Sequence, residues 1–171
     1  ERVGITTHQY KLNEDTEQGE IEDLIKELNS NNEVDAILLQ LPLPKHLNER
    51  YLMDLISPNK DVDGFGYKSI QGIFNDEDTI LPCTPKGILR LLDEYNIPTE
   101  GKNVVVLGRS TIVGKPIGLL MLSKKRNSTV IFCHSRSKNL ETITKQADIL
   151  IAAIGSPSFV KKDMVKNDVV I

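Results

Sequence analysis

The sequence has few of the residues on which disulfide-bonded, metal-binding and membrane proteins depend. Its 171 residues include only two cysteines, Cys83 and Cys133, which lie far apart and outside any C-x-x-C spacing. A disulfide framework and a zinc site are therefore both disfavoured. The three histidines are equally scattered and predict no metal site. No apolar run approaches the roughly 20 residues of a membrane-spanning helix, and no signal-peptide pattern is visible.

The charge balance disfavours two further classes of partner. A formal net charge of -3 gives no broad attraction to nucleic acid or to an anionic membrane. Glu1 is not a start methionine and residues 169–171 end within an expected strand, so we expect an internal portion of a longer chain. We expect a cytoplasmic protein, and a mitochondrial location stays open because the natural N-terminus would be missing.

The first half of the chain predicts helices, one strand and an irregular link. Apolar residues recur at helical spacing through residues 17–29 and predict an amphipathic helix. The apolar run 35–40 is typical of a buried parallel strand, and the prolines that follow must end it. Asn48 is expected to cap a helix that continues to Ile56. Residues 60–79 are dotted with glycine and predict irregular chain where two lobes join.

The second half alternates strands with helices. Thr84 and Pro85 are expected to start a helix as its N-cap and first residue. Beyond it we expect strands at 103–107, 129–133, 148–153 and 169–171, and helices at 113–124 and 139–147. This alternation predicts a doubly wound parallel sheet. We therefore expect an α/β protein with an N-terminal α/β lobe at 1–83 and a Rossmann-like lobe at 84–171.

The first strand of that sheet runs into a glycine turn, V-V-V-L-G-R-S-T-I-V-G-K-P-I. Aligned with the dinucleotide fingerprint G-x-G-x-x-G, Gly108 takes the first glycine position and Ser110 the second, while Gly114 comes one place late. The spacing alone fits a structural turn equally well, but the strand before it and the helix after it are the context that the motif requires. Arg109 adds a phosphate donor beside the amides of a helix N-terminus. The loop is therefore a candidate nucleotide site.

The end of the second strand predicts which nucleotide binds. An NAD site uses an acid there for the ribose 2′-hydroxyl, whereas this strand ends in Cys133-His134-Ser135-Arg136. A serine without an acid suits the 2′-phosphate of NADP. Arg136 is explained as well by a solvated loop as by contact with that phosphate.

Two polar sites stand out in the first half. Gln40 closes an apolar run at its carboxyl end, where open α/β sheets bind ligands, although a buried amide bonded to backbone explains it as well. Asp61-Val62-Asp63-Gly64 puts two carboxylates beside a glycine, which is also typical of a solvated turn.

Six motifs together resemble one family. They are I-L-L-Q-L-P-L-P-K-H at 37–46, S-P-N-K-D-V-D-G-F at 57–65, P-C-T-P-K-G at 82–87, G-R-S-T-I-V-G-K-P at 108–116, C-H-S-R-S at 133–137 and A-D-I-L-I-A-A-I-G at 147–155. In this order they resemble the bifunctional methylenetetrahydrofolate dehydrogenase/methenyltetrahydrofolate cyclohydrolase family. A two-lobe NADP enzyme of the shikimate dehydrogenase type would account for the second lobe but not for Q-L-P-L-P or P-C-T-P-K-G.

The resemblance implies a homodimeric enzyme of one-carbon metabolism and purine biosynthesis, with folate bound between a catalytic lobe and an NADP lobe. It implies oxidation of 5,10-methylenetetrahydrofolate by NADP, then hydrolysis of the methenyl product to 10-formyltetrahydrofolate. Gly108, Arg109 and Ser110 match the cofactor loop, and Ser135 matches a residue near the adenosine 2′-phosphate. Gln40 matches the glutamine beside the catalytic lysine. Asp63 matches the acid that recognises the pterin ring, so both are expected catalytic and substrate-binding residues.

One departure from the family leaves alternatives open. The catalytic lysine belongs to a Y-x-x-x-K element upstream of the strand that Val3-Gly4-Ile5 resembles, whereas Tyr10 and Lys11 lie after it without the spacing. Either the lysine precedes Glu1 or the protein lacks cyclohydrolase activity, and we expect the former. The alternatives are a dehydrogenase-only relative that uses NAD, and a nucleotide-binding module that has lost catalysis.

Overall fold

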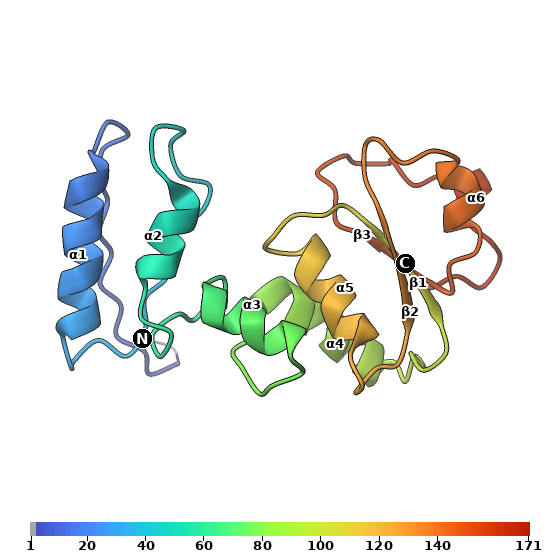
Figure 1. Cartoon of the computed structure of the whole chain (residues 1–171), viewed down its shortest axis with the longest axis horizontal. Coiled ribbons are helices and arrows are strands. Elements are labelled where there is room, and N and C mark those ends of the chain that lie inside the picture. The colour runs from blue at the N-terminus through green and yellow to red at the C-terminus, as the bar shows by residue number, and fades with distance from the viewer. Residues whose placement is uncertain (1–2) are drawn as a thin grey trace.

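The chain folds into two lobes that lie at the two ends of the computed structural model (Figure 1). The structure describes residues 3–171, so the predicted N-terminal lobe is described from Val3 onward. Two helices, α1 (Gln18–Ser30) and α2 (Glu49–Leu55), form the first lobe with their loops. The second lobe is a sheet with helices on both faces. Within residues 3–171, no helix is both long and apolar enough to cross a membrane.

The helices of the first lobe form where the apolar pattern predicts them. Ile21 and Ile25, one turn apart on α1, are buried against Leu52 of α2 in a small apolar core. The Asn48 side chain caps α2 by accepting the Tyr51 N–H at 3.1 Å, as expected of an N-cap asparagine. Both predicted helices are therefore confirmed to within one residue at their starts.

The carboxyl end of α1 is tied to the turn at 57–60. Lys60 Nζ donates to the carbonyl oxygens of Leu28, Asn29 and Asn31 at 2.8, 2.8 and 2.7 Å. These carbonyls lack partners within the helix, and a cation there also interacts favourably with the helix dipole. The contact holds the segment that leads into Asp61 against the first lobe.

The prediction of a strand at 35–40 is wrong. Of these residues only Ile37 forms a backbone bridge to another described segment, in parallel with Asp61, and its N–H donates to Lys60 at 2.8 Å. A strand needs a continuous row of partner groups, and one bridge leaves the neighbouring Leu38 60% exposed. The apolar run identified a buried position, Ile37, but not a ladder.

The link between the lobes contains a helix, so the prediction of irregular chain at 60–79 is wrong. Helix α3 (Tyr67–Phe74) buries Ser69, Gly72 and Ile73 and packs against the second lobe. It is followed by α4 (Cys83–Glu94), whose N-cap is Pro82 rather than Thr84. Pro85 is tolerated in the first turn, because the first N–H groups of a helix have no partner within it.

Three parallel strands form the sheet of the second lobe, in the order β2-β1-β3. They are β1 (Asn103–Leu107), β2 (Thr129–Cys133) and β3 (Ile149–Ala152), joined by α5 (Gly114–Leu122) and α6 (Leu140–Thr144). The first two strands are as predicted, and β3, α5 and α6 are shorter than expected. The strand predicted at 169–171 forms a single bridge from Val170 to Ile149. A short 3-10 helix, η1 (Lys162–Met164), precedes it.

Alternate residues of β1 pack in two separate hydrophobic cores, one on each face of the sheet. Val104 and Val106 pack with Leu92 of α4 and with residues of α5. Val105 and Leu107 pack on the other face with Cys133 and with residues of the α6 segment. Because successive strand side chains point to opposite faces, this division confirms the doubly wound α/β lobe.

Candidate active site

The loops that follow the three strands meet at one edge of the sheet. The Gly108 N–H donates to the Cys133 carbonyl at 2.8 Å, and the Ala153 N–H donates to the Leu107 carbonyl at 2.8 Å. Parallel strands place their carboxyl ends together, and open α/β sheets bind ligands there. This carboxyl edge therefore brings together the loop 108–110, the turn 134–137 and the chain after β3.

Gly108 is required by the geometry of this edge. Its φ of 110° lies in a region that L-residues with a side chain rarely adopt. A Cβ built at this position would also collide with the carbonyl oxygen of Ala153, the residue just after β3. The first glycine of the fingerprint therefore allows the turn after β1 to approach the neighbouring loop.

Gly114, one place late for the fingerprint, takes the role of its third glycine. A Cβ on Gly114 would lie 2.6 Å from the carbonyl oxygen of Gly108 and 3.0 Å from Cα of Arg109. The first residue of α5 therefore packs directly against the backbone of the loop, as the third glycine does between helix and strand. The shift in spacing does not abolish this close contact.

Ser110 holds the loop together. Its Oγ accepts the N–H groups of Val113 and Gly114, both at 3.2 Å, and its carbonyl accepts the Lys115 N–H at 2.9 Å. The hydroxyl hydrogen remains available as a donor, because Oγ acts only as an acceptor in these contacts. Arg109 is exposed and makes no hydrogen bond to another of residues 3–171, so its guanidinium is available to a ligand.

The turn after β2 is built by its own side chains and leaves Ser135 at the surface. The His134 N–H donates to Ser137 Oγ at 2.9 Å, and the Arg136 N–H donates to His134 Nδ1 at 3.2 Å. Ser135 and Arg136 are both exposed, and no acid occurs between residues 134 and 138. The fold therefore places Ser135 at the same edge as Gly108.

In the first lobe, the two aspartates of D-V-D-G differ in their burial and in their hydrogen-bond partners. Asp61 is 4% exposed, and its carboxylate accepts the N–H groups of Gly64 at 3.0 Å and Gly66 at 2.8 Å. Asp63 is half-buried, and burial, followed by the charge of Asp61, raises the pKa of its carboxyl. A Cβ on Gly64 would lie 2.7 Å from the Ile80 carbonyl, so the turn also packs against the chain before α4.

Gln40 follows the residue that bridges to the start of this turn. The parallel bridge between Ile37 and Asp61 aligns their two segments, so Gln40 and Asp63 both follow the bridge in the same direction. Gln40 is exposed, and among residues 3–171 its Nε2 donates only to the neighbouring Leu41 carbonyl, at 2.9 Å. It is therefore not the buried amide that its place after an apolar run suggested.

The residues that support the D-V-D-G turn were not identified from the sequence. Arg50 pairs with Asp54 through two hydrogen bonds of 2.9 and 2.6 Å and also donates to the Phe65 carbonyl at 3.0 Å. Asp54 accepts the Tyr67 N–H at 2.9 Å. The only sequence signal was the i,i+4 spacing of an arginine and an aspartate on a predicted helix.

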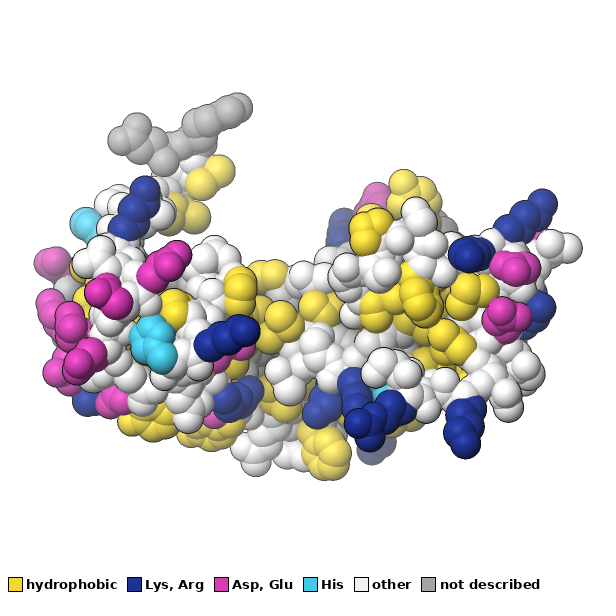
Figure 2. Space-filling view, turned by 90° about the horizontal axis from the view of Figure 1, so that it is seen from above, with side chains coloured by type: hydrophobic (Ala, Val, Ile, Leu, Met, Phe, Trp, Pro, Cys, Tyr) yellow, Lys and Arg dark blue, Asp and Glu magenta, His cyan; other side chains and the backbone are white. Residues whose placement is uncertain are grey.

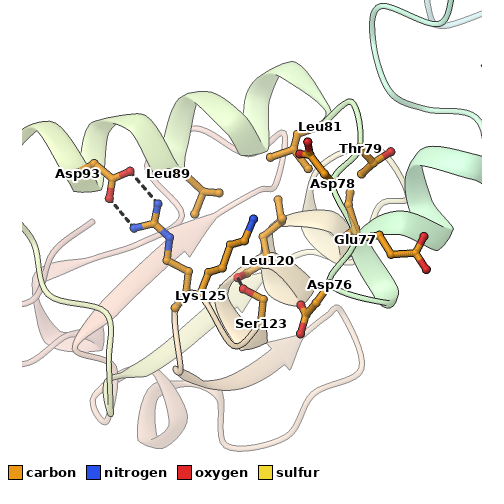
Figure 3. A pocket seen from close by; sticks show the side chains of 12 residues that line it. Asp76, Glu77, Asp78, Thr79, Leu81, Leu89, Asp93, Leu120, Ser123 and Lys125 are labelled. Atoms are coloured by element: carbon orange, nitrogen blue, oxygen red, sulfur yellow. Dashed lines mark hydrogen bonds and ion pairs between the residues drawn. The ribbon is translucent and has the colours of Figure 1, made fainter. Parts of the chain in front are cut away.

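Two surface hollows accompany these sites. In the space-filling view, the molecule is hollowed between its two lobes, and hydrophobic side chains are exposed in the hollow (Figure 2). A separate cavity of about 330 Å³ lies between α4, the end of α5 and the chain that follows α3 (Figure 3). Leu81, Leu89 and Leu120 line it together with the charged Asp78 and Lys125. It contains none of the predicted site residues.

Comparisons with known proteins identify the family. Residues 82–171 match the NAD(P)-binding domain of the tetrahydrofolate dehydrogenase/cyclohydrolase family, and residues 1–63 match its catalytic domain. The bifunctional protein FolD of Thermodesulfovibrio yellowstonii is 52% identical over 95% of this chain, and that of Acholeplasma laidlawii is 53% identical over 99%. The chain spans 56% and 60% of the length of these two relatives.

Solved structures agree in fold. The bifunctional FolD of Campylobacter jejuni superposes with a TM-score of 0.88 at 40% identity, over 92% of this chain and 55% of that one. The Trypanosoma brucei enzyme, solved with NADP and an inhibitor, has a TM-score of 0.83 at 29% identity, over 90% of this chain and 52% of its own. The resemblance of the six motifs is confirmed, and the chain belongs to the tetrahydrofolate dehydrogenase/cyclohydrolase family.

Proposed function

We propose that this protein oxidises 5,10-methylenetetrahydrofolate to 5,10-methenyltetrahydrofolate with NADP and hydrolyses the product to 10-formyltetrahydrofolate. The observation that carries the proposal is the carboxyl edge of β1 and β2, where Gly108 allows a close loop and where Arg109, the hydroxyl hydrogen of Ser110 and Ser135 are exposed to a ligand. Membership of the family and relatives named bifunctional protein FolD support the same reaction.

The residues at the carboxyl edge fit NADP better than NAD. The amides at the start of α5 suit the pyrophosphate, and the Arg109 guanidinium, a bidentate phosphate donor, suits the 2′-phosphate of NADP. Ser135 stands where an NAD site would place an acid, and a hydroxyl does not repel a 2′-phosphate. When bound, NADP supplies the nicotinamide ring that accepts a hydride. The protein contributes position and orientation, which dominate such a transfer.

Asp63 and Gln40 are the proposed folate-binding and catalytic residues. A half-buried carboxylate that accepts no hydrogen bond from another of residues 3–171 is suited to the N–H donors of a pterin ring. The exposed Gln40 amide lies on the same side of the bridge between Ile37 and Asp61 and would hold the group that carries the proton in the hydrolysis. We assign that proton to neither residue, since the family uses a lysine for it and Lys11 lacks the required spacing.

The remaining parts of the proposal follow from the family. We propose a cytoplasmic homodimer of one-carbon metabolism and purine biosynthesis, with folate lying between a lobe that ends at residue 83 and an NADP lobe that begins at residue 84. Two readings compete with it. One is a dehydrogenase that uses NAD and lacks the hydrolytic step, and the other is a nucleotide-binding module without catalysis.

The absorbance of methenyltetrahydrofolate tests these alternatives with one substrate. We expect the purified protein to form it from 5,10-methylenetetrahydrofolate faster with NADP than with NAD. Arg109→Ala should lower the NADP/NAD ratio of kcat/KM by about tenfold or more, because charge-assisted phosphate bonds are lost. Arg90→Ala, on the exposed face of α4, is the control.

Three results would count against the proposal in different ways. An unchanged ratio in Arg109→Ala would remove the assignment of the 2′-phosphate site. A preference for NAD with no hydrolysis would favour the dehydrogenase-only reading. Binding of NADP without any methenyl product would favour the module that has lost catalysis.

A further inference from the structure

The turn 61–66 is organised around one buried carboxylate. The two oxygens of Asp61 accept separate backbone N–H groups, from Gly64 and from Gly66. Asp63 lies within the segment that these bonds close. A buried charged acceptor with two amide donors forms strong hydrogen bonds, and the loss of one would leave a donor unpaired. The path of the backbone at Asp63 is therefore determined by the residue two places before it.

The other side of the turn is held from α2. Arg50 donates to the Phe65 carbonyl, and Asp54, which pairs with Arg50, accepts the Tyr67 N–H. These bonds continue the turn into α3 but leave the Gly64 amide to Asp61 alone. Arg50 and Asp54 thus support the end of the turn, while Asp61 supports its centre, where Asp63 lies.

We propose that Asp61 is a positioning residue for folate binding, because its bonds to the Gly64 and Gly66 amides fix the turn that presents the Asp63 carboxylate to the pterin ring. This inference rests on the proposed function. It assigns no contact with substrate to Asp61, whose carboxylate is buried and accepts a backbone N–H at each of its two oxygens. The motif resemblance assigns a role to Asp63 alone, and the role of Asp61 follows from its burial and its hydrogen-bond partners.

Charged and titratable groups of several elements lie near the turn. Arg50 and Asp54 contact it from α2, and the Sγ of Cys83 at the start of α4 lies 3.9 Å from the Val62 carbonyl oxygen. Tyr67 and Lys68 line a small pocket together with Asp61, and Lys60 precedes Asp61 in the chain. The negative charge of Asp61 helps to raise the pKa of Asp63, after burial. Removal of that charge should lower the pKa of Asp63, which a general loss of structure would not do selectively.

The test compares Asp61→Asn with wild type. Asparagine keeps the size of the side chain but replaces one acceptor oxygen by an NH₂ group that faces another N–H donor. We expect the dissociation constant for tetrahydrofolate to rise by about tenfold, or about 1.4 kcal/mol, within the range for a lost bond to a charged acceptor. The NADP affinity should change less than twofold. Asp35→Asn, an exposed aspartate of the same lobe, should match wild type in both.

Two NMR measurements on the ligand-free protein make the result independent of the proposed function. Amide exchange of Gly64 and Gly66 should become faster in Asp61→Asn, and the carboxyl of Asp63 should titrate at a lower pH than in wild type. If wild type does not bind tetrahydrofolate, the proposed function fails, while these two measurements still decide whether Asp61 fixes the turn.

Other outcomes would overturn the inference itself. They are unchanged tetrahydrofolate affinity in Asp61→Asn, an equal loss of tetrahydrofolate and NADP affinity, or unchanged exchange of the two glycine amides. Asp61→Ser, which keeps one acceptor, is the second variant in case Asp61→Asn does not fold. Failure of both to fold would show that Asp61 supports the whole lobe rather than the site.

Discussion

Replacement of Gly114 by alanine tests whether this glycine, one place late for the dinucleotide fingerprint, performs the packing role of the missing one. The added Cβ would lie 2.6 Å from the Gly108 carbonyl oxygen and 3.0 Å from Cα of Arg109. Both neighbours are backbone atoms that cannot rotate away, so α5 and the loop 108–110 must separate. The loop that we propose to hold the pyrophosphate would then lose its position.

The expected magnitude combines two opposing effects. Overpacking of this kind costs about 1–3 kcal/mol, while alanine in a helix is more favourable than glycine by roughly 0.5–1 kcal/mol. We therefore expect Gly114→Ala to lower the free energy of unfolding by about 1–2 kcal/mol and to weaken NADP binding by about tenfold, since one factor of ten corresponds to about 1.4 kcal/mol.

Urea denaturation and NADP titration measure both effects, and α4 offers a matched control. Gly87 lies within that helix, and apart from the backbone of the helix itself and its two chain neighbours no heavy atom lies within 4 Å of an added Cβ. Gly87→Ala should therefore stabilise the protein by about 0.5–1 kcal/mol and leave NADP affinity unchanged. If Gly114→Ala were as stable as Gly87→Ala and bound NADP as wild type does, the packing role assigned to Gly114 would be refuted.

Three further changes test other parts of the structure. Lys60→Met, measured by urea denaturation, should lower the free energy of unfolding by about 1–3 kcal/mol, because the carbonyls at the end of α1 lose a cationic donor. Lys45→Met, which changes an exposed lysine, should have no effect, and equal results for the two would contradict the contact. The raised pKa of Asp63 means that wild type loses stability as the pH rises through it. Asp63→Asn should therefore be more stable than wild type at neutral pH and bind tetrahydrofolate more weakly, with the stability gain vanishing at acid pH; a gain that persisted in acid would contradict the burial. A thiol reagent should modify Cys83 in the native protein but not Cys133, which is 1% exposed and whose pKa is raised by burial; rapid reaction of both would show that Cys133, at the end of β2, is not buried as described.

The sheet could be predicted because its strands carry their own signal. Val104, Val105 and Val106 form a β-branched run that is buried on both faces, and Gly108 marks its end. Such runs are typical of parallel strands. The bounds of β1 and β2 follow from apolar runs of this kind, and the chain between the two strands is long enough to contain a helix.

The helix in the link between the lobes could not be predicted, because its sequence carries little signal of its own. Helix α3 has eight residues and contains Gly72, so its intrinsic propensity is weak. Its stability comes from packing against α5, a contact between segments far apart in the sequence. The run 35–40 shows the converse, since its apolar residues look like a strand but most find no ladder partner in the described fold.

The sequence predicted residues that form the candidate site but not the residues that hold them in position. The motifs identify Gly108 and Asp63 as members of a cofactor loop and a folate turn, and these assignments stay predictions. The motifs gave Asp61 no role, because its burial and hydrogen-bond partners depend on the folded turn. Nor did they show that Gly114 meets the carbonyl of Gly108 across the loop.

Transfer of an isotopic label tests the central claim most directly. The protein is incubated with NADP and 5,10-methylenetetrahydrofolate that carries two deuterium atoms on its methylene carbon, and the reduced nicotinamide is analysed by NMR. Hydride transfer within the proposed site predicts deuterium on one face of C4 of NADPH, in an amount equal to the sum of methenyltetrahydrofolate and 10-formyltetrahydrofolate formed. Bound NADP that stays oxidised and gains no deuterium would contradict the account.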